Sequence, residues 1–329
     1  MTVAEQYRAA TERAAMFDVS DSAMIEVTGR DRATFLHSFC TNDIKKLQPG
    51  QGCEAFVTNV KGRIVGHVLV FAEDESLWID GDPGTQAVLL GHLNRYVITE
   101  DVEFHDRTGE FARSLVCGPA AVVTLAEQFG VSAARNPMYG GQHGLILAEF
   151  GLRRVPWSVA PAFLFMHQAA AMTDLVAALR AANVVPANGD VLELLRIEAM
   201  WPRYGVDLTE DYLAQEAGRT AQAISFTKGC YLGQEPIARL DALGHTNREL
   251  RGIRFEMPGE VTAGTQVLDA IGAVEVGAIS SVATHPVTNC PVALAMLKTV
   301  ANAPGTTVLA RTPSGTDLRG VVFGPPPII

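Results

Sequence analysis

The chain has 329 residues, a net charge of −10 and an isoelectric point near 5.3. This length suits two or three domains, and the acidic balance argues against a broad nucleic-acid surface, because phosphate binding needs clustered Lys and Arg. No apolar run approaches the roughly 20 residues that cross a bilayer, and the polar residues 1–8 do not resemble a signal peptide. We therefore expect a cytoplasmic protein without a membrane partner.

The cysteines show no metal-binding spacing. There are five of them, an odd number, and none forms a CxxC pair. This pattern fits free thiols in a reducing compartment rather than a disulfide framework. Four lie in or beside apolar stretches and are predicted to be small buried hydrophobic residues: Cys40, Cys53, Cys117 and Cys290.

In chain order, the first part of the sequence mixes helices with short strands. The turn Val60-Lys61-Gly62 joins two apolar runs and predicts a hairpin. Residue composition and helical spacing predict helices over residues 1–17, 31–39, 84–95 and 118–130. Apolar and β-branched runs predict strands over residues 23–28, 54–59, 63–71, 77–80, 102–105 and 114–117.

The second part of the sequence changes character after residue 246. Before that point we expect a turn at 139–144, a strand at 145–150, a long Ala- and Leu-rich helix at 161–183 and a helix at 191–201. After it, short β runs separated by Gly, Pro and Asn predict a separate small barrel or sandwich. These runs lie at residues 250–255, 266–268, 274–280, 293–297 and 307–310. Because the elements lack regular βα alternation, an α+β fold with antiparallel sheets is favoured.

The segment Lys228-Gly229-Cys230-Tyr231-Leu232-Gly233-Gln234-Glu235 carries the strongest chemical signal. Two glycines flank a cysteine, which allows an exposed turn. Lys228 lies two residues before the thiol and would favour its nucleophilic thiolate form. A Gly-containing loop with an incidental cysteine is the alternative interpretation on composition alone.

The whole string resembles the K-G-C-Y-x-G-Q-E signature of the YgfZ family, folate-binding relatives of the glycine-cleavage T-protein that support iron–sulfur enzymes. All seven specified positions match. Weaker similarities follow in the family's order along the chain: Phe35-Leu36, Thr41-Asn42-Asp43, residues 58–64, Arg196-Ile197-Glu198-Ala199, Tyr204-Gly205 and Val276-Gly277.

This resemblance implies a T-protein-like cloverleaf of three domains around a channel for tetrahydrofolate. The expected division is a folate-binding core of residues 1–50 and about 115–245, an inserted subdomain of about 51–114, and a C-terminal β-barrel of 246–329.

The resemblance also implies roles for single residues. By the family pattern Glu198 hydrogen-bonds the pterin ring, although a helix-surface glutamate is the alternative. Arg239 would pair with the glutamate tail of folate or form a structural salt bridge. Trp78 would line the folate site or belong to the core. Tyr231 and Gln234 complete the expected cofactor-binding residues.

The sequence departs from the T-protein pattern where those enzymes carry an Asp-Asp pair. Gly66 and His67 align with that pair, and neither supplies a carboxylate for a cationic centre. We therefore doubt glycine-cleavage activity. His67 would act as a general base, with Cys230 and Lys228 as the other expected catalytic residues; a hydrogen-bonded structural histidine is the favoured alternative.

Two functions remain open. The leading hypothesis is a tetrahydrofolate-binding accessory protein for iron–sulfur cluster assembly or repair, with iron–sulfur client or assembly proteins as partners and Cys230 as its functional thiol. The alternative is a folate-dependent aminomethyl or methyl transferase related to the T-protein.

Overall fold

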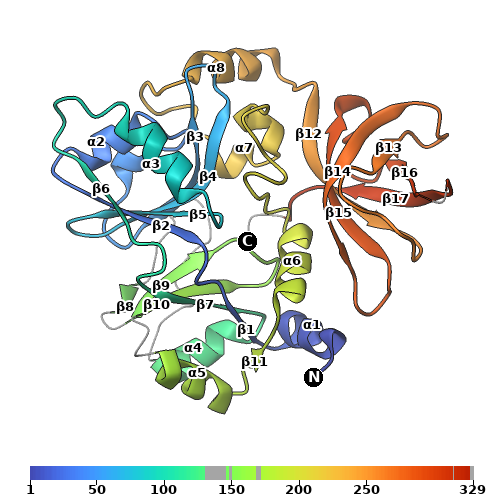
Figure 1. Cartoon of the computed structure of the whole chain (residues 1–329), viewed down its shortest axis with the longest axis horizontal. Helices are drawn as coiled ribbons and strands as arrows, with labels where there is room; N and C mark the ends of the chain where they lie inside the picture. The colour runs from blue at the N-terminus through green and yellow to red at the C-terminus, as the bar shows by residue number, and fades with distance from the viewer. Residues whose placement is uncertain (130–145, 148–149, 168–171, 314, 327–329) are drawn as a thin grey trace.

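The computed structural model describes residues 1–129, 146–147, 150–167, 172–313 and 315–326. Its strands form two open sheets and one closed barrel, with helices around them (Figure 1). Each sheet has its own apolar core, and a further core joins the first sheet, α6 and the barrel.

The first sheet has five antiparallel strands in the order β3-β4-β5-β2-β6. Their bounds are β2 Ala23–Thr28, β3 Gly52–Thr58, β4 Ile64–Ala72, β5 Leu77–Gly81 and β6 Glu103–Asp106. Helices α2 (Arg32–His37) and α3 (Gln86–Asn94) pack against it through Leu36, Leu89 and Leu93. The division expected near residue 50 therefore falls inside this sheet, between β2 and β3.

The second sheet has six strands in the order β11-β1-β7-β10-β9-β8, antiparallel except for the β1–β11 pair. Their bounds are β1 Ala15–Asp18, β7 Ala112–Cys117, β8 Ile146–Leu147, β9 Phe150–Val155, β10 Ala162–His167 and β11 Val185–Pro186. Helices α4 (Ala121–Phe129) and α5 (Met172–Ala181) lie along this sheet at the lower edge of Figure 1.

The C-terminal strands close into a barrel in the order β12-β15-β14-β13-β16-β17, which confirms the barrel expected after residue 246. Their bounds are β12 Arg248–Phe255, β13 Gln266–Leu268, β14 Glu275–Thr284, β15 Pro291–Lys298, β16 Thr307–Arg311 and β17 Asp317–Phe323. Short 3₁₀ turns occur at Ile44–Lys46, Ala214–Ala217 and Thr299–Ala301.

The remaining helices of the described residues are α1 Val3–Glu12, which precedes the first strand, and α6 Gly189–Glu198, α7 Thr220–Ala223 and α8 Gln234–Leu243, which lie in the chain between the second sheet and the barrel. α6 begins at an Asn188 side chain that caps Val191 N–H, which satisfies one free amide of its first turn. It packs against α1 and against barrel strands β14 and β15. Its C-terminal residue, Glu198, therefore lies where α1 and the barrel meet.

The predictions for several secondary-structure elements were wrong. The segment predicted as one helix over residues 161–183 is strand β10 followed by α5. The aromatic residues Phe163 and Phe165 are buried in β10, which pairs with β7 and β9 in the sheet. The first helix ends at Glu12 instead of Phe17, and β1 follows. β17 was missed, and the turn expected at 139–144 lies outside the described residues.

No helix among the described residues is both long and apolar enough to span a membrane.

Candidate functional site

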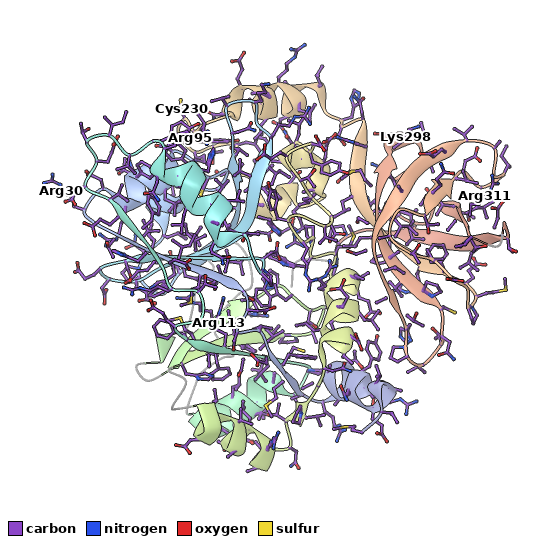
Figure 2. All side chains as sticks on the ribbon, in the orientation of Figure 1. Arg30, Arg95, Arg113, Cys230, Lys298 and Arg311 are labelled. Carbon is purple, nitrogen blue, oxygen red and sulfur yellow. The ribbon has the colours of Figure 1, made fainter. Side chains whose placement is uncertain are left out.

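The Cys230 loop packs against the β3–β4 hairpin and leaves its thiol exposed. Gly233 adopts a left-handed φ of 80°, and a Cβ there would lie 2.2 Å from the Asn59 carbonyl oxygen, so the second glycine of the signature is required for this close approach. Thr58 Oγ1 also donates to the Leu232 carbonyl at 2.7 Å. Cys230 thus lies on a surface loop just before α8, where Figure 2 labels it.

Lys228 has a different role from the one the sequence indicated. Its Nζ is buried and donates to the carbonyl oxygens of His37, Cys40 and Asn42 at 2.6, 2.5 and 2.9 Å. Burial lowers the pKa of Lys228 to about 8. Because the ammonium is held by carbonyls at the end of α2 and just after it, the geometry gives no support to Lys228 as the activator of the Cys230 thiol.

The Thr41-Asn42-Asp43 segment braces the chain that leads to this loop. Thr41 Oγ1 donates to the Ala223 carbonyl at 2.6 Å, and Asn42 Nδ2 donates to the Gln222 carbonyl at 3.0 Å. These contacts tie the segment between α2 and β3 to α7. The segment is therefore a scaffold for the loop.

His67 lies inside a buried ionic network. Its Nε2 is 2.9 Å from Glu54 Oε1, and Arg219 donates to both Glu54 oxygens at 2.8 and 2.5 Å. Burial alone would raise the pKa of Glu54, but Arg219 and His67 outweigh it and lower the pKa to about 2. His67 also stacks on Phe56 and is only 2% exposed. This environment favours the structural histidine.

Gly66 is equally unsuited to carry a functional group. A Cβ at this position would lie 2.6 Å from Leu89 Cδ2 of α3. The space that a side chain would need is therefore filled by the packing between α3 and the sheet, and the aligned acidic pair has no counterpart at positions 66 and 67.

Glu198 forms a second polar cluster, at the junction of α1, α6 and the barrel. Its two carboxylate oxygens lie 3.2 and 3.0 Å from the Tyr7 hydroxyl. Burial raises the pKa of Glu198, while the Tyr7 hydrogen bond and the charges of Arg254 and His285 act in the opposite direction. The His285 ring packs edge-on against Tyr7, with centroids 4.8 Å apart. Glu198 is thus a partly buried carboxylate with acceptor capacity left.

The other predicted cofactor residues do not join Glu198. Trp78 is 6% exposed and packs in the core against Phe111, with Arg153 over its ring at 5.5 Å. Tyr231 is buried beneath Lys228 Nζ, 4.7 Å from its ring centroid, and burial raises its pKa to about 12. Trp78 and Tyr231 are therefore packing residues.

Gln234 and Arg239 both lie on α8. The backbone N–H of Gln234 donates to the Tyr231 carbonyl at 3.1 Å, which begins the helix, and Arg239 is exposed. Figure 1 shows α8 at the outer edge of the molecule and α6 near its centre. The structure therefore separates Arg239 from Glu198.

One further carboxylate, Asp82, was not predicted from the sequence. It follows β5 and lines a cavity of about 170 Å³ together with Trp157 and Trp201. Tyr204 N–H donates to Asp82 Oδ2 at 2.7 Å, and burial raises the pKa of this carboxyl group. The available signal was local: Asp82-Pro83-Gly84 is a turn directly after a buried strand, a place where functional groups often lie.

Glu54 and Arg219 were also missed. An ionisable residue inside the apolar run Cys53–Val57 is unusual enough to mark Glu54 as paired. Its partner Arg219 lies 165 residues away, a pairing that local patterns cannot reveal. Among the described residues, no group of three or more His, Cys, Asp or Glu side chains is arranged to hold a metal.

Comparison with known proteins agrees with this architecture. The family model described as the GCVT N-terminal domain matches residues 1–228. An aminomethyltransferase of Symbiobacterium thermophilum is 27% identical over 325 residues, covering 93% of this chain and 84% of that protein. A putative chloroplast transferase of Arabidopsis thaliana is 26% identical, and the alignment covers 93% of this chain and 69% of that protein.

The similarity extends to solved structures. The glycine-cleavage aminomethyltransferase T of Bartonella henselae superposes with a TM-score of 0.86 at 19% identity, covering 98% of this chain and 89% of that one. This match confirms the expected α+β T-protein-like fold with its C-terminal barrel. With more than half of its length matched by the family model, the chain belongs to the GCVT family, whose fold is that of the folate-dependent aminomethyltransferases.

Proposed function

We propose that this protein binds tetrahydrofolate and transfers a one-carbon unit between the folate and an amine. The observation that carries the proposal is the partly buried Glu198 carboxylate at the junction of α1, α6 and the barrel, within the GCVT-family fold. The relatives named aminomethyltransferase support the same class of reaction.

The surroundings of Glu198 fit a pterin. An aminopyrimidine edge offers two N–H donors, and a carboxylate has roughly four lone-pair sites, of which the Tyr7 hydroxyl uses part. Because burial already raises the pKa of Glu198, two N–H donors from a ligand would stabilise the ionised carboxylate strongly. In this proposal Glu198 binds and orients the pterin, and the folate supplies the one-carbon carrier.

The proposal does not include glycine cleavage. The space beside Gly66 is occupied by the Leu89 side chain, and His67 contacts Glu54, so neither position presents a free carboxylate to a cationic intermediate. The amine substrate is therefore expected to differ from that of the glycine-cleavage T-proteins.

Calorimetric titration with tetrahydrofolate and with 5-formyl-tetrahydrofolate tests the binding step. We expect saturable binding to the wild-type protein and at least about tenfold weaker binding to Glu198→Gln, because one charged acceptor becomes a neutral amide. The exposed Glu75→Gln is the matched control. Absence of binding, or equal affinity of wild type and Glu198→Gln, would rule out this site.

Turnover tests the transfer step. Tetrahydrofolate loaded with a one-carbon unit is incubated with protein and candidate methylated or primary amines, and the products are separated by mass. A product that forms only with active protein supports the transferase. Failure of every tested amine in the presence of tight folate binding would leave a folate-binding protein without this activity.

A second function is favoured by one specific observation, the exposed thiol of Cys230 in an intact Lys228–Glu235 signature. In this alternative the protein is a YgfZ-type, folate-binding accessory protein that supports assembly or repair of iron–sulfur clusters. The test is complementation of a host that lacks its own copy, read out by iron–sulfur enzyme activity. Full rescue by Cys230→Ala would remove the thiol from the mechanism, and Cys290→Ala serves as the control.

A further inference from the structure

A larger cavity of about 550 Å³ lies between the tip of the β3–β4 hairpin and one face of α3. Val60 and Lys61 line it from the hairpin, and Val88 and Gly91 line it from the helix. Among the described residues, it shares no lining residue with the cavity at the end of β5. A cavity of this size suits a small organic molecule.

The helix side of this cavity is open because its residues are small. Ala87, Gly91 and Arg95 are spaced four residues apart, so they lie along one face of α3 and its C-cap. Apart from its chain neighbours and the backbone of its own helix, a Cβ at Gly91 would meet no atom within 4 Å. Arg95, which Figure 2 labels, ends this row and also lines the cavity. The small residues therefore leave room beside a cation.

Two cations on the lining lack a counter-charge. Within the described part of the chain, the exposed side chains of Lys61 and Arg95 form no ion pair and no hydrogen bond. His92 adds no positive charge at neutral pH, because burial and the charge of Arg95 lower its pKa against the opposing effect of the Thr58 carbonyl. Among the lining residues that the structure describes, Glu210 is the only acid. The balance of the lining is therefore positive.

The hairpin holds the backbone of Lys61 on a fixed turn. Asn59 Oδ1 accepts a hydrogen bond from the backbone N–H of Lys61 at 2.9 Å. Gly62 has a left-handed φ of 68°, and a Cβ there would lie 2.9 Å from the Gly233 carbonyl oxygen, so the hairpin tip packs closely against the Cys230 loop. Asn59 also lines the cavity, and its Nδ2 keeps N–H donors for a ligand. The turn is thus positioned before a ligand binds.

Exposed apolar side chains border these cations. Val60 is 62% exposed and Val88 is 44% exposed, and both line the cavity. The Tyr96 ring belongs to the same lining and packs against Phe39 with centroids 4.9 Å apart. An inorganic anion would leave this apolar surface in water, whereas an organic group would cover it. The lining therefore suits an anion that carries an apolar body.

We propose that this cavity binds an organic phosphate monoester, whose phosphate lies between Lys61 and Arg95 and whose organic body covers the two valines. A phosphate monoester carries about two negative charges at neutral pH and three acceptor oxygens, so it matches two cations and the Asn59 amide. A carboxylate offers one charge and two oxygens. The inference does not rest on the proposed function, because Glu198 takes no part in it.

Calorimetric titration of the full-length protein with phenyl phosphate tests the inference. Inorganic phosphate lacks the organic body, benzoate carries a carboxylate in place of the phosphate, and phenol carries no charge. We expect saturable binding of phenyl phosphate, about tenfold weaker binding of inorganic phosphate and of benzoate, and no binding of phenol. The titrations are done at one low ionic strength, because salt screens exposed charges.

Gly91 offers a steric test that leaves both cations in place. Gly91→Leu should fill the open space beside α3 and weaken phenyl phosphate binding by at least about tenfold. This variant should fold well, because leucine has a higher helix propensity than glycine. Gly91→Ala is the matched control: it adds only a Cβ, so its affinity should stay within about threefold of wild type.

Two charge variants locate the phosphate. Lys61→Gln and Arg95→Gln should each weaken phenyl phosphate binding by about tenfold, because each removes a charged donor. Arg180→Gln should bind like wild type and is the matched control, since Arg180 is also exposed and lies in the last turn of a helix, α5. Melting temperatures within a few degrees of wild type establish that all of these variants fold.

Each outcome bears on the inference. No saturable binding of phenyl phosphate to wild type, or wild-type affinity in both charge variants or in Gly91→Leu, would overturn it. An equal loss in Arg180→Gln would overturn it as well, because the anion would then respond to charge far from the cavity. Affinity for benzoate equal to that for phenyl phosphate would reject the phosphate as the recognised group, and equal affinity for inorganic phosphate would reject the organic body.

Discussion

The Tyr7 hydroxyl lies within hydrogen-bonding distance of both carboxylate oxygens of Glu198, 3.2 Å from Oε1 and 3.0 Å from Oε2. This contact ties the first helix of the chain to the end of α6, 191 residues later. It also holds in place the carboxylate that we propose as the pterin ligand, so the N-terminal helix contributes to the geometry of the proposed folate site.

Replacing Tyr7 with Phe should reduce stability by about 1 kcal/mol at pH 7.5, because a partly buried carboxylate loses its hydroxyl donor. Burial raises the pKa of Glu198, and the Tyr7 hydrogen bond partly offsets this shift, so the variant should raise the pKa further. As the pH falls and Glu198 becomes protonated, the difference from wild type should shrink. Urea unfolding of both proteins at pH 7.5 and pH 4.5 measures this difference in the free energy of unfolding.

Tyr212→Phe is the matched control for this prediction. The Tyr212 ring packs under Arg248 at 4.5 Å, and its hydroxyl forms no hydrogen bond with another described residue. Its removal should change stability little at either pH. A pH-independent loss in Tyr7→Phe would show that packing, not the bond to Glu198, is responsible.

Glu54→Gln should destabilise the protein by about 3 kcal/mol at pH 7, because the buried Arg219 guanidinium would lose the carboxylate that it contacts through two nitrogens. Arg219 and His67 hold the pKa of Glu54 at about 2 against the opposing effect of burial. A carboxyl group with a lowered pKa in the folded state stabilises above its unfolded pKa and loses this effect as the pH falls toward the folded value. The difference between wild type and variant should therefore narrow from about pH 4.5 downward.

Urea midpoints at pH 7, 4 and 3 measure this narrowing, with the exposed Glu75→Gln as reference. If the stability difference between wild type and Glu54→Gln stays constant over this range, the ion pair with Arg219 does not keep Glu54 ionised in the folded state.

The sequence predicted those parts of the fold that depend on local patterns. The β3–β4 hairpin and most barrel strands show alternation and turn residues within short windows, and both formed as expected. The prediction for residues 161–183 was wrong because Ala and Leu have high helix propensity, while the pairing of β10 with β7 depends on residues about 50 positions away.

The candidate site was predictable only where a motif identified it. Cys230 and Glu198 lie in sequence motifs that resemble those of a known family. In the structure the Cys230 thiol is exposed, and the Glu198 carboxylate can accept further hydrogen bonds. The partners of these residues were not predictable, since Tyr7 meets Glu198 and Lys228 meets Asn42 only through the folded chain. Lys228 shows the limit most clearly, because two residues of separation from Cys230 did not bring the two side chains into contact.

His67→Gln decides between the two interpretations of His67. If His67 were a general base, its loss would reduce turnover by about 10²–10⁴-fold. As a buried structural residue that contacts Glu54 and Trp201, it should instead reduce stability and leave turnover per folded molecule within about threefold. The measurement is the rate of one-carbon transfer, normalised to folded protein, together with its pH profile. A loss of the pH dependence with normal folding would restore the catalytic interpretation.

Thiol alkylation tests the separate roles of Lys228 and Cys230. Cys230 is exposed, whereas burial raises the pKa of Cys40 and Cys117 to about 12, so iodoacetamide at pH 8 should modify Cys230 rapidly and those two only after unfolding. Peptide mass mapping identifies the modified residue, and Cys230→Ala should abolish the fast phase.

Lys228→Gln then asks whether the ammonium activates this thiol. Its Nζ is bound by the carbonyls of His37, Cys40 and Asn42, so we expect lower stability but an alkylation rate of Cys230 within about threefold of wild type at pH 7. An activating charge would make the variant about tenfold slower at pH 7, and the difference would disappear at pH 10, where free thiols in general are ionised. Such a pH-dependent loss in folded protein would reassign Lys228 from the scaffold of the loop to its chemistry.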